Sequence, residues 1–387
     1  MAKPKAKMTS RERVTAALHH QEPDRVPLDI GGGNSTSLLV ETYENLKQYM
    51  GINTPTRIAS KAFRIAALDE EMMARLGGDL RPVWLKGPKR LAPPPPSEPD
   101  TFIDMWGIKY RKADYPGGYY WEMCGHPLAN ATISDLDKYS WPDPDDPGWF
   151  EGLAEEVKNL YNSTPYALLG DFGFKGFWEM GYFLRGLEQC LYDILKNKEF
   201  WHAYMNRMLE LNMAFGKKYL EITGPYLTAV RTADDLASQA GPIISPKTYR
   251  EVLKPYQKKL NQFIKKYTDA TIFYHSCGNI SDMVEDLIDA GFEALNPVQV
   301  SAIPDPAGLK EKYGDRVSFW GAIDSQHVLP HGTPEDVRQE VKLRIRQLGR
   351  GGGYVVAGVH NLNPDVPPQN IVAMAEAARE FGVYPIR

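Results

Sequence analysis

A histidine and a cysteine two residues apart, His275 and Cys277, have the side chains and spacing of a metal site. They end an apolar run, 271–274, which predicts a short buried strand. Side chains two apart in a strand point to the same face, so both should reach one spot at the strand's end. Imidazole nitrogen and thiolate sulfur are ligands that zinc prefers. The alternative is a hydrogen-bonded histidine beside an inert buried thiol.

A third candidate ligand, His360, lies near the C-terminus. It follows the apolar segment 354–358 and precedes Pro364, Pro367 and Pro368, so we expect it on an irregular loop. A catalytic zinc ion takes three protein ligands and keeps one open position. His275, Cys277 and His360 therefore predict a zinc centre. The alternative for His360 is a loop histidine bonded to backbone.

Eight strand-like segments alternate with helical patterns along the chain. These segments are 25–30, 80–85, 166–170, 226–231, 271–275, 294–296, 317–321 and 354–358. The alternation predicts an α/β protein with a (β/α)₈ TIM barrel, whose strands are apolar because both faces are buried. A doubly wound open sheet is the second choice, but its Gly-x-Gly-x-x-Gly turn is missing.

The interval 87–147 interrupts the alternation. It contains the proline run 93–96 and then two short segments, 108–112 and 119–123, around Pro116-Gly117-Gly118, which predict a hairpin. The interval has too few apolar residues for a core of its own. We therefore expect one barrel domain over 10–387, with this hairpin inserted near the barrel mouth, and a disordered tail over 1–9.

Polar residues follow the ends of the predicted strands. In such barrels the catalytic groups lie at the carboxyl ends of the strands. The residues in these positions, besides the three candidate ligands, are Asp29, Asp171, Arg231, Asp234, Asp235, Asn296, Gln299 and Asp324. Any one of them, Asp234 and Asp324 above all, could instead be a helix cap or turn residue. Together they predict the polar mouth of an enzyme.

A group of aromatic residues follows Asp171. It comprises Phe172, Phe174, Phe177, Trp178, Tyr182 and Phe183, and Trp320 lies in the seventh predicted strand. Such residues at helical spacing are often core. Next to a polar mouth they also predict a flat apolar pocket for an aromatic or macrocyclic ligand.

Composition excludes several classes of function. The net charge of −4 gives no electrostatic reason to bind nucleic acid or an anionic membrane. The three cysteines are far apart and odd in number, which favours a reducing compartment. No apolar run reaches the roughly 18 residues of a membrane span, and Met1–Lys7 lacks the apolar region of a secretory signal. We expect a cytoplasmic protein.

Five blocks of the chain resemble the uroporphyrinogen decarboxylase superfamily. They read RERVTAALHHQEPDRVPLDIGG, DDLASQAGPIISPKTYREVLKPY, HSCGNISDMVEDLIDAGFEALNPVQ, FWGAIDSQHVLPHGTPEDV and VHNLNPDVPPQNI. The resemblance implies a (β/α)₈ barrel. It also implies one of two activities, because the superfamily contains true decarboxylases and corrinoid-dependent methyltransferases.

The decarboxylase branch carries arginines after the first strand that bind the carboxylates of its tetrapyrrole substrate. In this chain the same place reads Asp29-Ile30-Gly31-Gly32-Gly33-Asn34, with no arginine. An acidic or neutral mouth does not suit a substrate with many carboxylates. The comparison favours the methyltransferase branch, whose His-x-Cys zinc motif is matched by His275 and Cys277.

Members of that branch that methylate coenzyme M have a further cysteine where this chain offers His360. One thiolate fewer makes the zinc a better Lewis acid, suited to polarising an oxygen. The resemblance therefore implies methyl transfer from a methoxylated aromatic compound to the cobalt of a corrinoid (cobalamin) carried by a partner protein.

The same resemblance suggests roles for the mouth residues. Asp234 or Asp235 would be the general acid or would orient a ligand histidine, and the aromatic group with Trp320 would hold the ring. The other polar mouth residues, Asp29, Asp171, Arg231, Asn296, Gln299 and Asp324, would contact substrate. Two alternatives stay open: a methylcorrinoid:thiol (coenzyme M-type) methyltransferase, and a non-catalytic corrinoid- or tetrapyrrole-binding barrel. A homodimer also stays open.

Overall fold

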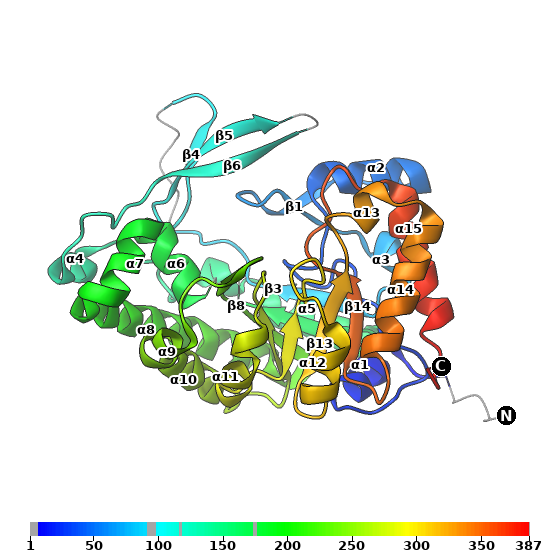
Figure 1. Ribbon diagram of the computed structural model, residues 1–387. Coiled ribbons are helices and arrows are strands. Elements are labelled where there is room, and N and C mark those ends of the chain that lie inside the picture. The colour runs from blue at the N-terminus through cyan, green and yellow to red at the C-terminus, as the bar shows by residue number, and fades with distance from the viewer. Residues whose placement is uncertain (1–6, 91–97, 116–117, 173–175, 387) are drawn as a thin grey trace.

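The computed structural model describes residues 7–90, 98–115, 118–172 and 176–386 (Figure 1). Parts of four sequence-based predictions lie outside these residues: most of the N-terminal tail, the proline run 93–96, the turn residues Pro116 and Gly117 of the inserted hairpin, and Phe174 of the aromatic group. Within the described part, the prediction of an α/β barrel is confirmed.

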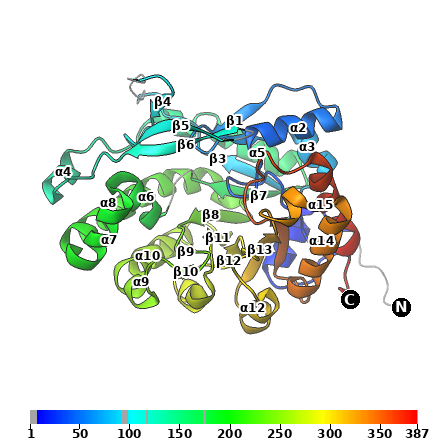
Figure 2. The ribbon, with the colours of Figure 1, turned by 45° about the horizontal axis from the view of Figure 1, so that its top comes forward.

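Seven parallel strands form one curled sheet, which makes most of the barrel wall (Figure 2). The spatial order is β14-β13-β12-β11-β8-β7-β3. The strands are β3 (Leu80–Trp84), β7 (Ala167–Asp171), β8 (Ala229–Ala233), β11 (Thr271–His275), β12 (Ala294–Asn296), β13 (Ser318–Ile323) and β14 (Tyr354–Gly358). Because the strands are parallel, their carboxyl ends all lie at one end of the barrel, the mouth.

The first predicted strand, 25–30, is not a regular strand. Leu28 makes only an isolated parallel bridge to Val356, and the N–H of Asp29 donates to the carbonyl of Val356. On the other side, the N–H of Asp79 donates to the carbonyl of Leu28. Pro27 has no N–H to donate, and the N–H of Leu28 donates to the Asp79 side chain instead of a strand. The segment therefore closes the barrel between β14 and β3 with too few ladder bonds for a strand.

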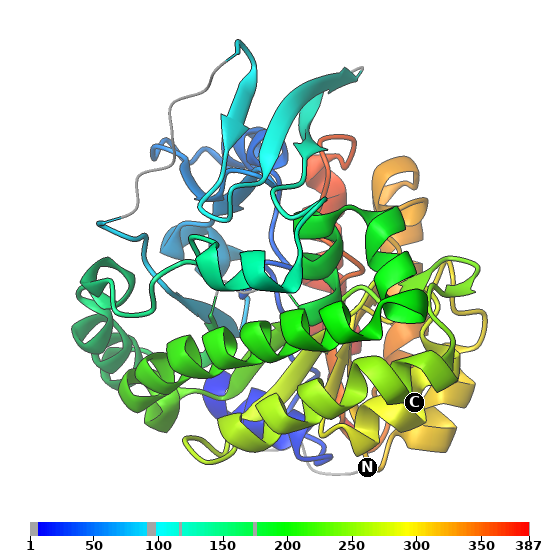
Figure 3. The same ribbon diagram turned by 90° about the vertical axis from the view of Figure 1, so that its left-hand side faces the viewer.

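Helices follow the strands and cover the outside of the barrel (Figure 2). They are α2 (Val40–Met50), α3 (Glu70–Leu76), α5 (Leu153–Ser163), α6 (Phe177–Arg185), α7 (Leu187–Lys196), α8 (Lys198–Thr223), α9 (Pro246–Val252), α10 (Lys254–Ile264), α11 (Val284–Asp289), α12 (Pro306–Tyr313), α13 (Val328–His331), α14 (Pro334–Leu348) and α15 (Pro368–Phe381). The longest, α8, has 26 residues and crosses one whole side of the molecule (Figure 3). Among the described residues, no helix combines the length and apolar character needed to cross a membrane.

Helix α1 (Ser10–Leu18) closes the end of the barrel opposite the mouth. It begins with a capping box, in which Thr9 and Glu12 bond to each other's backbone N–H groups. Val14 and Leu18 belong to the apolar cluster that fills the barrel interior with Phe273 and Trp320. Helix α1 therefore packs against the side chains that fill the barrel interior.

The inserted hairpin is confirmed. Strands β5 (Lys109–Tyr115) and β6 (Gly118–Gly125) pair antiparallel, and β4 (Thr101–Ile103) adds a third strand beside β5. This small sheet projects beyond the barrel mouth (Figure 1), and helix α4 (Ile133–Lys138) follows it. A second hairpin, β1 (Arg57–Ser60) and β2 (Ile65–Ala67), lies near it (Figures 1 and 2). A two-residue pair, β9 (Ala237–Ser238) and β10 (Gly241–Pro242), follows β8.

A buried carboxylate, Asp79, ties the closed end of the barrel together. It has no exposed surface, and it accepts hydrogen bonds from Arg13 Nη1 at 2.7 Å and Arg25 Nη1 at 2.8 Å. The Ser10 hydroxyl and the Leu28 N–H also donate to it. One side chain thus joins α1, the irregular segment 25–30 and the start of β3.

Replacing Asp79 by alanine should lower the free energy of unfolding by about 3 kcal/mol, because the partly buried Arg25 would lose its counter-charge and the buried Arg13 would keep only Asp24. Urea titration followed by circular dichroism measures the loss. Glu151→Ala is the matched control, since Glu151 pairs with Lys89 at an exposed site and should contribute little. A loss below about 1 kcal/mol for Asp79→Ala would show that Asp79 and its arginine partners do not stabilise the closed end of the barrel.

Candidate metal centre

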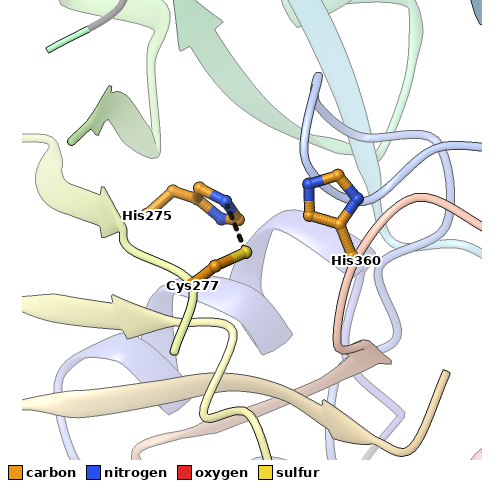
Figure 4. A group of neighbouring side chains, drawn as sticks. All are labelled: His275, Cys277 and His360. Atoms are coloured by element: carbon orange, nitrogen blue, oxygen red, sulfur yellow. Dashed lines mark hydrogen bonds between the residues drawn. The ribbon is translucent and has the colours of Figure 1, made fainter. Parts of the chain in front are cut away.

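The three predicted ligands meet at the barrel mouth (Figure 4). His275 is the last residue of β11, Cys277 follows two residues later, and His360 follows β14. The closure of the barrel brings these strands' ends together, so that one ligand atom from each residue lies within 4.8 Å of the others. His275 is buried, Cys277 is half-buried and His360 is exposed, so an ion between them could be reached from solvent.

The spacing of the donors fits zinc. Tetrahedral zinc, with Zn–N near 2.0–2.1 Å and Zn–S near 2.3 Å, places a nitrogen and a sulfur ligand about 3.6 Å apart. His275 Nε2 and Cys277 Sγ are 3.5 Å apart. This distance also allows a hydrogen bond between a thiol and an imidazole, which is the alternative interpretation of the pair. The third ligand, His360, would complete a nitrogen–sulfur–nitrogen set with one position open.

Asn296, the last residue of β12, orients His275. Its Nδ2 donates to the carbonyl of Trp320 at 3.1 Å, so its Oδ1 is the atom that faces His275. Nδ1 of His275 donates to that oxygen at 2.5 Å. With the proton on Nδ1, the lone pair on Nε2 is free and points toward Cys277 Sγ. An outer partner of this kind is the usual way in which a protein fixes a metal-binding histidine.

Burial sets the protonation of both donors. It lowers the pKa of His275 to about 4, so the imidazole is neutral at pH 7, as a ligand must be. Burial, with Asp235 and Glu179 nearby, raises the pKa of the Cys277 thiol. A metal ion would therefore have to displace the thiol proton when it binds.

Asp235 is the carboxylate beside the three ligands. Its Oδ1 accepts the N–H of Cys277 at 2.7 Å and lies 3.8 Å from Nε2 of His275. Its side chain is about one-third exposed, at 32%. Asp235 is thus fixed at one oxygen and accessible from the mouth.

Asp234, the other predicted acid, anchors a helix instead. Its carboxylate accepts the backbone N–H groups of Trp178 and Glu179 at the start of α6, and Gln257 Nε2. It is completely buried, and burial raises its pKa to about 7. Both Asp234 and Asp324 thus have the alternative role stated above, that of a helix cap or turn residue. Asp324 accepts the N–H groups of Gln326 and His327.

Asp29 and Trp320 lie below the mouth. Trp320 has no exposed surface and packs edge-on against Phe273 in the barrel interior. Its Nε1 donates to Asp29 Oδ2 at 2.9 Å, and burial raises the pKa of Asp29 to about 6. The predicted contact of these two residues with substrate is not supported by their positions. Gly32 is required here because a Cβ atom would lie 2.3 Å from Asp29 Oδ1.

Other predicted mouth residues hold the loops around the centre. Arg231 donates to the Ser35 hydroxyl and lies 3.6 Å from Asp171. Asp171 accepts Nδ2 of Asn34, so the two residues fix the loop 31–36 against β7 and β8. Gln299 accepts the N–H of Gly278 at 2.7 Å and so holds the turn after Cys277.

Most of the predicted aromatic pocket is core. Phe172, Trp178 and Phe183 are buried, and Phe174 lies outside the described residues. Tyr182 is partly exposed, with Asp235 among the charges that act on it. Aromatic residues of the inserted hairpin line an open cleft, and the run Tyr119-Tyr120-Trp121 is the sequence signal that could have indicated it.

The chain resembles known proteins of two activities. The family model described as uroporphyrinogen decarboxylase (URO-D) matches residues 127–381. A uroporphyrinogen decarboxylase of Pseudoalteromonas translucida is 26% identical over 260 residues, which cover 65% of this chain and 69% of that protein. The methylcobamide:CoM methyltransferase MtaA of Methanosarcina barkeri is 28% identical over 187 residues, 48% of this chain and 51% of that protein.

Among solved structures, a methyltransferase from Methanosarcina mazei aligns with a TM-score of 0.64. The alignment covers 97% of this chain and 99% of that chain at 18% identity. At this identity the likeness shows the shared fold.

Replacing Asn296 by alanine should weaken zinc binding about 10- to 100-fold, because the His275 ring loses the partner that orients it. Competition with a chromophoric chelator measures the affinity in purified protein. Asp324→Ala, which removes a mouth carboxylate that caps a turn and contacts His327, should leave the affinity unchanged. Equal zinc affinities for Asn296→Ala and the parent protein would contradict the assigned role of Asn296.

Proposed function

This chain belongs to the uroporphyrinogen decarboxylase (URO-D) family, and within that family we propose that it is a corrinoid-dependent methyltransferase. Its methyl donor is a methoxylated aromatic compound, and its acceptor is the cobalt of a corrinoid carried by a partner protein. The observation that carries the proposal is the group His275, Cys277 and His360 at the barrel mouth. Similarity to the methylcobamide:CoM methyltransferase MtaA supports the corrinoid-dependent part of the proposal.

The difficulty of the reaction lies in its leaving group, because a phenolate leaves poorly unless its negative charge is stabilised. Cobalt(I) attacks the methyl carbon, a cobalt–carbon bond forms, the O–CH₃ bond breaks, and its electron pair stays on the aryl oxygen. A zinc ion held by His275, Cys277 and His360 would supply a Lewis acid for that oxygen. A set with one thiolate and two neutral imidazoles leaves the site net positive with a divalent ion, which favours a developing negative charge.

The protein's own groups keep these donors in place and manage the proton. Asn296 fixes the ring of His275, and Gln299 fixes the turn after Cys277. Asp235 is held at Oδ1 by the N–H of Cys277, so its Oδ2 is the candidate atom to bring a proton to the leaving oxygen. We assign no proton transfer to Asp234, whose carboxylate is occupied by the start of α6.

Tetrapyrrole decarboxylation fits this mouth less well. A substrate with many carboxylates needs free cations around it. Arg231 is the arginine of the mouth that was predicted to contact substrate, and it is already engaged with Ser35 and Asp171.

Methyl transfer to a thiol is the second candidate. The similarity to the methylcobamide:CoM methyltransferase MtaA favours it. In that case the open position between the three ligands would receive a thiol, and demethylation of methylcobalamin would depend on added thiol. A barrel that only binds a corrinoid would instead show binding without turnover.

Replacing His275 or Cys277 by alanine should lower methyl transfer at least about a hundredfold, since Lewis-acid stabilisation is worth several kcal/mol. The assay follows the spectrum of a reduced corrinoid protein on addition of a methoxybenzoate. Cys190→Ala is the control, because Cys190 is a buried free cysteine away from the three ligands. Near-normal turnover in both ligand variants would contradict the proposal.

The donor class is tested separately with a panel of methoxybenzoates, methanol, methylamine and small thiols. We expect cobalt methylation with methoxybenzoates alone. Methylation by methanol or methylamine without any methoxyarene would overturn the choice of donor. Thiol-dependent loss of methyl from methylcobalamin would establish the second candidate instead.

A further inference from the structure

A cleft of about 650 Å³ lies between the two hairpins near the barrel mouth. Phe63 comes from the turn between β1 and β2, and Tyr115, Tyr119, Tyr120 and Trp121 come from β5 and β6. The two hairpins lie side by side in both views (Figures 1 and 2). Neither hairpin belongs to the barrel wall, so the cleft is an addition to the (β/α)₈ fold.

The walls of this hairpin cleft present aromatic rings to solvent. Phe63 is 44% exposed, Tyr115 38% and Tyr120 52%. Exposed aromatic side chains gathered at one concave place are a mark of a binding site, because isolated ones are the normal case on a surface. Tyr119 and Trp121, which alternate with Tyr120 along β6, are partly buried and pack edge-on against each other.

The remaining wall of the hairpin cleft continues from the metal centre. Asn363, Pro364 and Asp365 line it, only three to five residues beyond His360. Leu39, another lining residue, donates its N–H to the carbonyl of Leu362. The loop that presents His360 therefore also forms a side of the hairpin cleft.

Charge and size indicate what the hairpin cleft could hold. Arg64 lines it, but this guanidinium is paired with Glu41 and stacks 3.6 Å from the ring centre of Tyr119. Apart from the carboxylate of Asp365, the lining thus offers ring faces more than free charge. A volume of about 650 Å³ is in the range of small-ligand pockets, whereas a protein partner would need a surface of roughly 800 Å².

We propose that the hairpin cleft binds the planar ring of an aromatic small molecule, with Phe63 and Tyr120 among the rings that it contacts. Resting on the proposed function, this molecule is the methyl donor, and the inserted hairpin selects donors that have an aromatic ring. The hairpin cleft would hold the donor before its ether oxygen reaches the three candidate ligands, none of which lines the cleft.

The test is isothermal titration with 4-methoxybenzoate and with its saturated analogue, 4-methoxycyclohexanecarboxylate, in the absence of any corrinoid protein. The parent protein should bind the aromatic compound more tightly. The double variant Phe63→Ser, Tyr120→Ser should bind it about tenfold or more weakly, because two ring contacts are lost. Both positions are exposed, so the thermal unfolding midpoint should not change.

Tyr192→Ser is the matched control. Tyr192 is 55% exposed on α7, outside the hairpin cleft, and its replacement should leave the affinity for 4-methoxybenzoate unchanged. Equal loss in this control and the double variant would overturn the inference, as would absence of binding by the parent protein.

The outcomes also separate this inference from the proposed function. Loss of 4-methoxybenzoate binding in the double variant supports the hairpin cleft as its binding site, even if no methyl group is transferred. Absence of methyl transfer would contradict only the proposed function. If the double variant binds 4-methoxybenzoate as tightly as the parent protein, the inference about the hairpin cleft is wrong, even if methoxyarenes are demethylated. A raised KM for the corrinoid protein with unchanged ring affinity would identify the surface as a partner contact and would also overturn the inference.

Discussion

The hydrogen bond from His275 Nδ1 to Asn296 Oδ1 determines which nitrogen of the imidazole faces Cys277. If the proton were on Nε2, that nitrogen would donate a hydrogen bond to the sulfur of Cys277. It would then have no lone pair with which to bind a metal ion. The choice is fixed further inside, because Asn296 is held by the carbonyl of Trp320, and the Trp320 side chain is held by Asp29. The metal centre therefore depends on the layer of packed side chains beneath it.

The barrel explains why residues so far apart in the chain can share one ion. Cys277 and His360 follow strands that are separated by two others in the sheet, and only the closure of the wall brings their ends together. Helix α1 blocks the opposite end, so the mouth is the open side. The two hairpins then add aromatic walls that the barrel itself does not have.

The apolar runs and the His-x-Cys spacing were enough to predict seven strands, the inserted hairpin and the meeting of His275, Cys277 and His360. Side-chain roles were harder, because a carboxylate after a strand looks the same whether it caps a helix, as Asp234 does, or faces the mouth, as Asp235 does. Trp320 is likewise a strand residue whose face only the barrel geometry decides. The hairpin cleft needs two segments about 50 residues apart, and no local pattern shows that they face each other.

The central claim is that one sulfur and two nitrogen donors hold zinc at the mouth. X-ray absorption at the zinc edge of the purified protein tests it directly. We expect one sulfur near 2.3 Å, two imidazole nitrogens at 2.0–2.1 Å and one further light ligand from solvent. Protein that contains no zinc, or zinc whose inner shell lacks sulfur, would contradict the account.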